Sequence, residues 1–218
     1  TLLAAGVLAS AAAVILLWRL GIEMYSRSAG VLAASLLLFN PVFWFGALTN
    51  QVRLCLAFCS IGVALLAWRS LQTRSGVWLC ATFAAVGISA GFRPGIALVM
   101  LPLLLWVWWR SGGDPSRLAL AVTTALIACA PWVVAVSLSV GGMQSWLELM
   151  WRYANEQFSG SSAAFGAPLD SARLMARKAM VWNGLGVLSW IWAAPFAIRR
   201  DCETKSAGRA IFLAIWFL

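Results

Sequence analysis

A single arginine lies between two apolar runs of the sequence, within a turn of glycine and proline. Arg93 stands between residues 77–90 and 96–109, which are fourteen residues each. As membrane-spanning helices, at ~1.5 Å per residue, each run would cover roughly 21 Å of the ~30 Å of bilayer hydrocarbon. The sequence therefore predicts a guanidinium at shallow membrane depth, where an unpaired charge is costly and an anionic ligand such as a phosphate would suit it. The alternative is that Arg93 only extends to lipid headgroups.

The turn also predicts the backbone around Arg93. We expect Gly91 to end the first helix in the left-handed conformation and Pro94 to begin the next helix. Because a residue before proline is biased away from helical geometry, Arg93 is expected to be extended.

A second polar group follows Asn40-Pro41 and the aromatic residues behind that proline, where we expect the chain to bend along the membrane interface. A helix is expected to start at Thr49 or Asn50, residue types favoured at helix N-termini. Asn50, Gln51 and Arg53 are predicted to line a shallow polar pocket and, with Arg93, to bind substrate. Helix capping combined with headgroup contact is the alternative for these residues.

Proton chemistry in this chain depends on carboxylates, because the sequence contains no histidine. The long segment 141–180 provides three acids, Glu148, Glu156 and Asp170. None of them is assigned as a catalytic base, so the catalytic residue stays unknown. Glu148 and Glu156 also flank Arg152 at four-residue spacing, which is typical of a solvated ladder of ion pairs.

The cysteines predict packing rather than chemistry. Cys55 and Cys59 share a helix face, but two thiols without a third ligand make a poor metal site. Four of the five cysteines fall within apolar runs, so no disulfide framework is expected. We predict no metal site and no cofactor in this chain.

The composition places these groups in a membrane protein. Of the 218 residues, 62% are hydrophobic and 11% are charged, with a mean hydropathy of +0.87, whereas soluble domains have ~45–50% apolar and ~25% charged residues. We exclude a cytosolic enzyme and predict an all-α, polytopic transmembrane helical bundle of about eight spans. The spans are expected near residues 2–18, 29–39, 54–68, 77–90, 96–109, 118–138 and 181–198, and from 210 onward.

The net charge of +9 follows the pattern of membrane topology rather than of nucleic-acid binding. Ten of the sixteen basic residues fall in or directly beside the short connectors between alternate spans, which the positive-inside rule assigns to the cytoplasm. Trp18-Arg19, Trp68-Arg69 and Trp109-Arg110 each close a run at that side, as expected of side chains at the level of the headgroups. The connectors predicted to be cytoplasmic are 21–28, 70–76, 111–116 and 199–209.

We predict one transmembrane domain over residues 1–218, with an exoplasmic interfacial loop at 141–180. From Trp146 onward, apolar and polar residues separate onto two helical faces, which predicts a helix on the membrane surface. Because the chain begins at Thr1 without an initiator methionine and stops within an apolar run, we expect it to be part of a longer protein.

Three segments in order carry a resemblance to a known family. They are the small-residue segment 27–34, the Asn40-Pro41 break with its aromatics and polar helix start, and Gly87-Ile88-Ser89-Ala90-Gly91-Phe92-Arg93-Pro94. Together they resemble the membrane core of GT-C glycosyltransferases, which include protein O-mannosyltransferase-like and lipid A aminoarabinose transferase-like enzymes. The similarity covers about 14–110 closely and the remainder by layout.

The resemblance implies transfer of a sugar from a polyprenyl phosphate donor to an acceptor at the exoplasmic face. It places Arg93 near the donor phosphate. The catalytic acid would lie in a loop before Thr1, where a divalent metal is expected in the full-length protein. This chain departs from many relatives at Thr49-Asn50-Gln51, where they carry a carboxylate.

The expected partners are membrane lipids and the lipid-linked sugar donor, in a bacterial inner membrane. Neither the sugar, the acceptor nor the oligomeric state follows from the sequence. Two other classes fit the same residues: a transporter or flippase of an anionic lipid-linked substrate, and a non-catalytic membrane subunit. The transporter is less favoured because the spans carry no charge near their middle.

Overall fold

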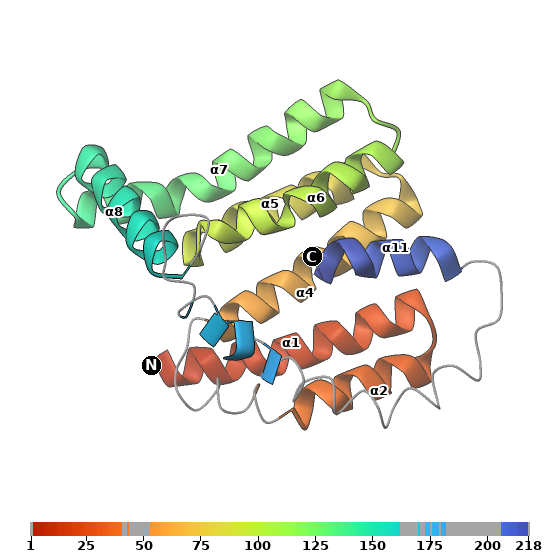
Figure 1. Cartoon of the computed structure of the whole chain (residues 1–218). Helices are drawn as coiled ribbons and strands as arrows, with labels where there is room; N and C mark the ends of the chain where they lie inside the picture. Colours follow the sequence, from red (N-terminus) through yellow and green to blue (C-terminus); the bar gives the residue numbers. More distant parts are fainter. Residues whose placement is uncertain are drawn as a thin grey trace. The chain divides into compact units, whose positions relative to one another are not determined.

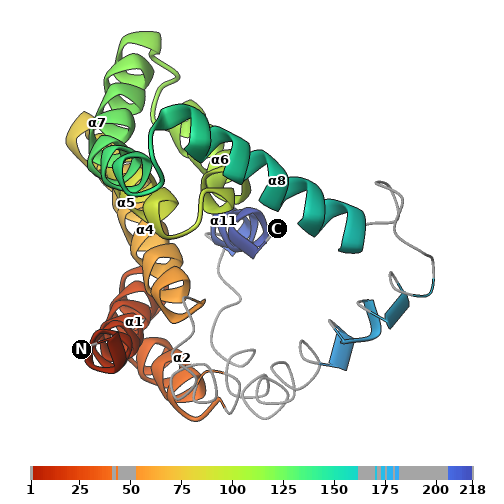
Figure 2. The ribbon, with the colours of Figure 1, turned by 90° about the vertical axis from the view of Figure 1, so that its left-hand side faces the viewer.

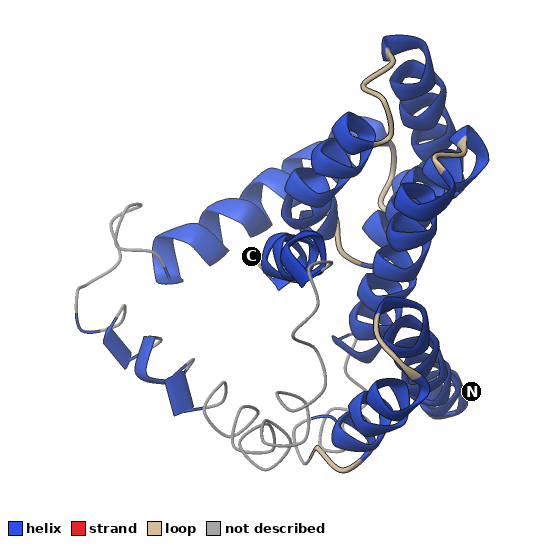
Figure 3. Ribbon diagram, turned by 90° about the vertical axis from the view of Figure 1, so that its right-hand side faces the viewer, coloured by secondary structure: helices blue, strands red, loops and turns tan. Residues whose placement is uncertain are grey.

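The computed structural model describes residues 2–40, 43, 53–161, 170, 173–174, 176–178, 180–181 and 206–217. Within this part of the chain every regular element is a helix and no strand occurs (Figure 3). The all-α prediction is therefore confirmed. The helices are α1 (Leu2–Met24), α2 (Arg27–Leu38), α4 (Arg53–Thr73), α5 (Gly76–Phe92), α6 (Gly95–Arg110), α7 (Pro115–Ser139), α8 (Met143–Ser161) and α11 (Ser206–Phe217).

The helices cover the apolar runs of the sequence and continue beyond several of them. Helix α1 continues to Met24, six residues beyond the predicted end of the apolar run at residue 18. The helix therefore includes polar residues that follow the run. Three helices, α1, α4 and α7, contain stretches that are long and apolar enough to cross a membrane, and α2, α5 and α6 are shorter apolar helices. Except for Val181, the span predicted at 181–198 lies outside the described residues, so the number of eight spans stays a prediction.

The chain divides into two compact units. One unit contains Thr1–Ala130 and Ala193–Leu218, and the other contains Pro131–Trp192. The boundary falls inside α7, next to Pro131.

In the first unit, α1 lies beside α2, α4 beside α5, and α5 beside α6, each pair running antiparallel (Figure 1). Helix α4 packs against both α1 and α5, and α11 lies beside α6 (Figure 2). Phe212 of α11 is fully buried, with its ring 5.3 Å from that of Trp68 and 6.0 Å from that of Trp106. The indole N–H of Trp216 donates to the Ser60 hydroxyl at 2.9 Å. Helix α11 thus contributes to the core of this unit.

Two glycines allow helices to approach with backbone against backbone. A Cβ atom at Gly30 of α2 would lie 2.5 Å from the carbonyl oxygen of Trp18 in α1. A Cβ atom at Gly87 of α5 would overlap the carbonyl oxygen of Ala125 in α7. Small residues at such crossings are typical of helix pairs in membranes, where close packing replaces the hydrophobic effect as the driving force.

The connector before α7 is closed by an acidic cap. The Ser116 backbone N–H and hydroxyl donate to Asp114 Oδ1 at 3.0 and 2.5 Å, and Pro115 takes the first helical position. The Trp108 indole N–H donates to the Asp114 carbonyl oxygen at 2.9 Å. The Ser116 hydroxyl is the main reason that the pKa of the Asp114 carboxyl lies below its ordinary value.

Candidate functional site

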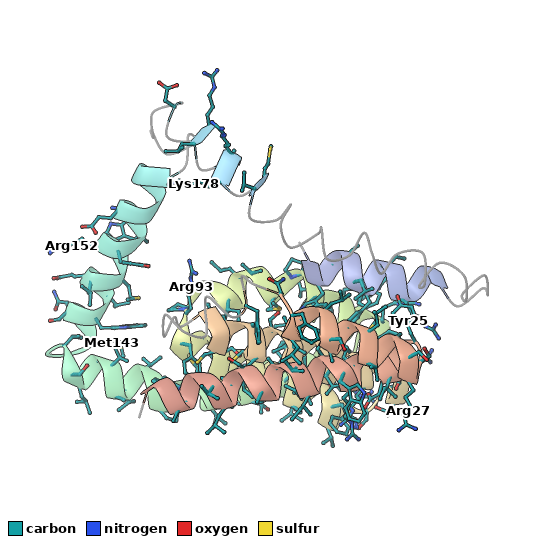
Figure 4. The ribbon with its side chains drawn as sticks, turned by 90° about the horizontal axis from the view of Figure 1, so that it is seen from below. Tyr25, Arg27, Arg93, Met143, Arg152 and Lys178 are labelled. Carbon is teal, nitrogen blue, oxygen red and sulfur yellow. The ribbon has the colours of Figure 1, made fainter. Side chains whose placement is uncertain are left out.

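The antiparallel order of the helices brings two of the predicted binding residues, Arg53 and Arg93, to one end of the first unit. Helix α4 begins at Arg53 and α5 returns to Phe92, so the backbones of Arg53 and Arg93 lie at the same end. Tyr25, in the connection between α1 and α2, and Arg27, the first residue of α2, lie at the opposite end (Figure 4).

Arg93 is extended, as predicted, with φ −155° and ψ 108°, and its backbone N–H donates to the Ser89 carbonyl oxygen at 3.3 Å. The prediction for Gly91 was wrong, because Gly91 is still helical and α5 ends at Phe92. Pro94 disfavours helical geometry at the preceding residue, and the helix stops here without a left-handed glycine. Pro94 itself is helical, with φ −55° and ψ −33°, and leads into α6.

The Arg93 side chain is exposed and has no hydrogen bond or ion pair to any residue that the structure describes. The flanking helices have 17 and 16 residues, longer than the fourteen-residue runs of the sequence, so each covers roughly 24–26 Å at ~1.5 Å per residue. This remains below the ~30 Å of hydrocarbon in a typical bilayer. Arg93 is therefore still expected below the surface of the hydrocarbon layer, but less deeply than the fourteen-residue runs predict.

Three other residues were predicted to line the pocket with Arg93. Arg53 is the first residue of α4, and its side chain lies outside the described part of the structure. Asn50 and Gln51 also lie outside the described residues. Their grouping with Arg93 stays a prediction.

The opposite end of the unit carries most of the positive charge. Of the nine arginines described in this unit, Arg53 and Arg93 lie at one end and seven at the other. This separation agrees with the side assignment made from the connectors. The seven are Arg19, Arg27, Arg69, Arg74, Arg110, Arg117 and Arg209.

One cluster at that end was missed by the sequence analysis. Arg69 Nη2 lies 2.6 Å from Glu23 Oε1, and Arg69 Nε lies 3.1 Å from Glu23 Oε2. The Trp68 indole N–H donates to the Glu23 carbonyl oxygen at 3.4 Å, and the Arg69 guanidinium stacks 5.1 Å from the ring centroid of Trp78 in α5. Trp68 and Arg69 therefore bind protein groups, which corrects the interpretation that they face lipid headgroups. The signal available in the sequence was Glu23, an acid at the end of an apolar run.

This cluster predicts a measurable contribution to stability. Because the Glu23 and Arg69 side chains are only 21% and 25% exposed, Glu23→Gln is expected to lower the free energy of unfolding by roughly 1–2 kcal/mol. Arg19 also faces Glu23, but at 3.4 Å and 60% exposed, so Arg19→Gln is expected to change stability by less than about 1 kcal/mol. Unfolding titrations with SDS in mixed micelles measure both variants. Equal losses for the two would contradict the assignment of Arg69 as the main partner.

The carboxylates of the second unit show no arrangement for catalysis. Glu148, Glu156 and Asp170 are all exposed. No ion pair joins Glu148 to Arg152 among the described residues, so this pair of the predicted ladder is not formed. Asp170 lies 3.8 Å from Arg173, in a contact exposed to solvent.

The described residues also do not fit a divalent metal. No group of three Cys, Asp or Glu side chains in this part of the chain is close enough to hold an ion. The four cysteines in the described ranges, Cys55, Cys59, Cys80 and Cys129, are free.

Apolar helices packed through glycines, with charges at the helix ends, define an integral membrane protein of the polytopic, all-α class. Residues 1–135 match the dolichyl-phosphate-mannose-protein mannosyltransferase family. The chain belongs to this family, and its resemblance to GT-C glycosyltransferases is thereby confirmed.

The chain is also similar to bacterial sugar transferases. It is 30% identical over 156 residues to the undecaprenyl phosphate-alpha-4-amino-4-deoxy-L-arabinose arabinosyl transferase of Pseudomonas aeruginosa strain LESB58, covering 71% of this chain and 25% of that protein. It is 30% identical over 183 residues to the transferase of the same name from Pseudomonas paraeruginosa, covering 82% and 30%. The chain thus spans about a quarter to a third of the length of these relatives. No solved structure matches the chain.

Proposed function

We propose that the chain forms part of a membrane glycosyltransferase that moves a sugar from a polyprenyl phosphate donor to an acceptor at the exoplasmic face. The family match and the relatives, which are named for an undecaprenyl phosphate-linked sugar, support the class of reaction and of donor. The relatives come from Pseudomonas, which supports a bacterial inner membrane as the location.

The observation that carries this proposal is the position of Arg93. Its extended backbone lies between two short apolar helices, and its guanidinium is exposed with no partner among the described residues. A guanidinium can meet two oxygens of one phosphate and can stabilise the charge that develops on a phosphate leaving group. Arg93 would bind the donor phosphate in this role. Asn50, Gln51 and Arg53 are proposed to line the same pocket.

The transporter alternative has less support. In the first unit, every charged residue that the structure describes lies near a helix end or in a connector. A transporter of an anionic substrate usually has polar groups or broken helices near the middle of the bilayer. The non-catalytic subunit stays open because no catalytic acid is assigned within this chain.

One experiment separates the three classes. The complete protein is reconstituted in vesicles with an undecaprenyl phosphate-linked sugar labelled in both its sugar and its lipid, together with a membrane extract as a source of acceptor. A transferase releases undecaprenyl phosphate and moves the sugar label to another molecule. A flippase moves the intact donor between leaflets without releasing sugar, and a non-catalytic subunit does neither. Either of the last two results would contradict the proposal.

The proposed side assignment predicts which positions a membrane-impermeant thiol reagent can reach in intact cells. In a background without native cysteines, single cysteines at Ser28, Ser75 and Ser206 are expected to stay unlabelled. Ser28 is preferable to Ser26, whose side chain accepts from the Ala29 N–H and caps α2. A cysteine at Gly95, where a side chain meets open space, is the control and is expected to be labelled. Labelling of the three serine positions without labelling of Gly95 would show that the topology is the reverse of the one proposed.

A further inference from the structure

Helix α8, at Met143–Ser161, has one polar face and an apolar side on which several side chains are exposed among the described residues. Met143, Leu147 and Trp151 recur at four-residue spacing, and their side chains are 48%, 55% and 71% exposed. Leu149 and Tyr153 are also half exposed, but at ~100° per residue Leu149 lies roughly 200° around the helix from Leu147 and does not belong to this stripe. Figure 4 labels Met143 near the start of α8 and Arg152 further along the helix. So large an apolar surface marks a site of interaction rather than a face in contact with water.

The connection from α7 indicates what covers this surface. Helix α7 has 25 residues and is apolar enough to cross a bilayer. Only a short turn separates it from α8, and this turn contains Gly141 and Gly142 with φ of 91° and 122°. Since glycine adopts these angles readily, the chain reverses direction within a few residues of the end of a span. A helix that starts there begins at the level of the lipid headgroups.

The composition of α8 supports the same conclusion. Tryptophan and tyrosine prefer the boundary between lipid and water, and α8 carries Trp146, Trp151 and Tyr153. Its polar face carries charges of both signs, with Glu148 and Glu156 on either side of Arg152. This face has no positive excess that would draw the helix to anionic lipids, so apolar contact must supply the attraction.

We propose that α8 lies in the plane of the bilayer surface, with Met143, Leu147 and Trp151 inserted among the lipids and its charged face in water. The occupant of the exposed apolar side is therefore lipid. Because apolar contact drives the insertion, its depth does not depend on the anionic lipid content or on salt. The inference does not rest on the proposed transferase activity.

Spin labels on single cysteines test the proposal in the complete protein. The native cysteines are first replaced, and labels are then attached at Leu147→Cys, Trp151→Cys or Ser145→Cys. Ser145 is the matched control, because it is exposed and lies roughly 200° around the helix from Leu147 at ~100° per residue. The protein is reconstituted in vesicles of phosphatidylcholine, with and without phosphatidylglycerol. Collision rates are measured with oxygen, which dissolves in lipid, and with a water-soluble nickel complex.

Labels at Leu147 and Trp151 are expected to collide several-fold more with oxygen, relative to nickel, than the label at Ser145, in both kinds of vesicle. Equal access of nickel to all three labels would overturn the proposal and leave α8 in water. Protection of the Leu147 label from both reagents would also overturn it, because protein would then cover this face. A dependence on phosphatidylglycerol would contradict the part of the proposal that excludes electrostatic attraction.

Discussion

Arg93→Ala is expected to lower sugar transfer by the complete protein roughly ten- to a hundredfold. The reason is the loss of a charge-assisted hydrogen bond to the donor phosphate, worth ~1.5–3 kcal/mol. Arg93→Lys should lose less, because lysine keeps the charge but not the fork that contacts two phosphate oxygens. The rate of sugar transfer from a polyprenyl phosphate donor in reconstituted vesicles measures both variants.

Arg110→Ala is the matched control for Arg93. Arg110 is also exposed and ends the helix that begins just after Arg93, at the opposite end of the unit. The Arg110→Ala substitution should therefore leave the rate of sugar transfer nearly unchanged. Arg53→Ala is expected to have an intermediate effect, since Arg53 begins a helix that can reach open headgroups. If Arg93→Ala transfers sugar at the wild-type rate while the protein stays inserted, Arg93 contacts only lipid headgroups and the site lies elsewhere.

Gly30→Ala is expected to destabilise the protein by roughly 1–3 kcal/mol, the usual cost of overpacking. The added Cβ atom would lie 2.5 Å from the carbonyl oxygen of Trp18 and 2.8 Å from the Ile22 side chain. Because one of these neighbours is backbone, α1 and α2 must move apart to accommodate it. This cost exceeds the gain of up to ~1 kcal/mol that alanine brings to a helix interior. Gly87→Ala, which meets the backbone of Ala125, should behave in the same way.

Gly62→Ala is the control for these substitutions, with an expected change of the opposite sign. At Gly62 the nearest atom to an added Cβ is a Leu16 methyl group at 3.6 Å, an ordinary contact. The helix propensity of alanine should then raise stability by up to ~1 kcal/mol. Unfolding by SDS, followed by tryptophan fluorescence, measures all three variants. A Gly30→Ala protein as stable as the wild type would show that α1 and α2 pack less closely than the structure indicates.

The positions of the helices were predictable from the sequence because each apolar run between charged residues is long enough to form one. The extended backbone at Arg93 was predictable as well, since proline restricts the residue before it through local sterics alone. The contacts of Glu23 with Arg69 and Trp68 were not predictable from the sequence, because they depend on how α1 and α4 pack against each other. The sequence resemblance included Gly30 and Gly87, but only the structure shows that they are crossing points. The grouping of Asn50, Gln51 and Arg53 with Arg93 stays a prediction.

The packing of α11 has a consequence for the order in which the protein folds. The contact between Trp216 and Ser60 joins residues 156 positions apart in the chain, and the Phe212 ring lies against Trp68 and Trp106. During synthesis, α4 and α6 are therefore made long before α11, which packs against them, exists. The whole of residues 131–192 must leave the ribosome before Phe212 can reach its place. Until then the apolar surface around Trp68 and Trp106 lacks the cover that Phe212 gives it, and such transiently exposed surface is where misassembly can begin.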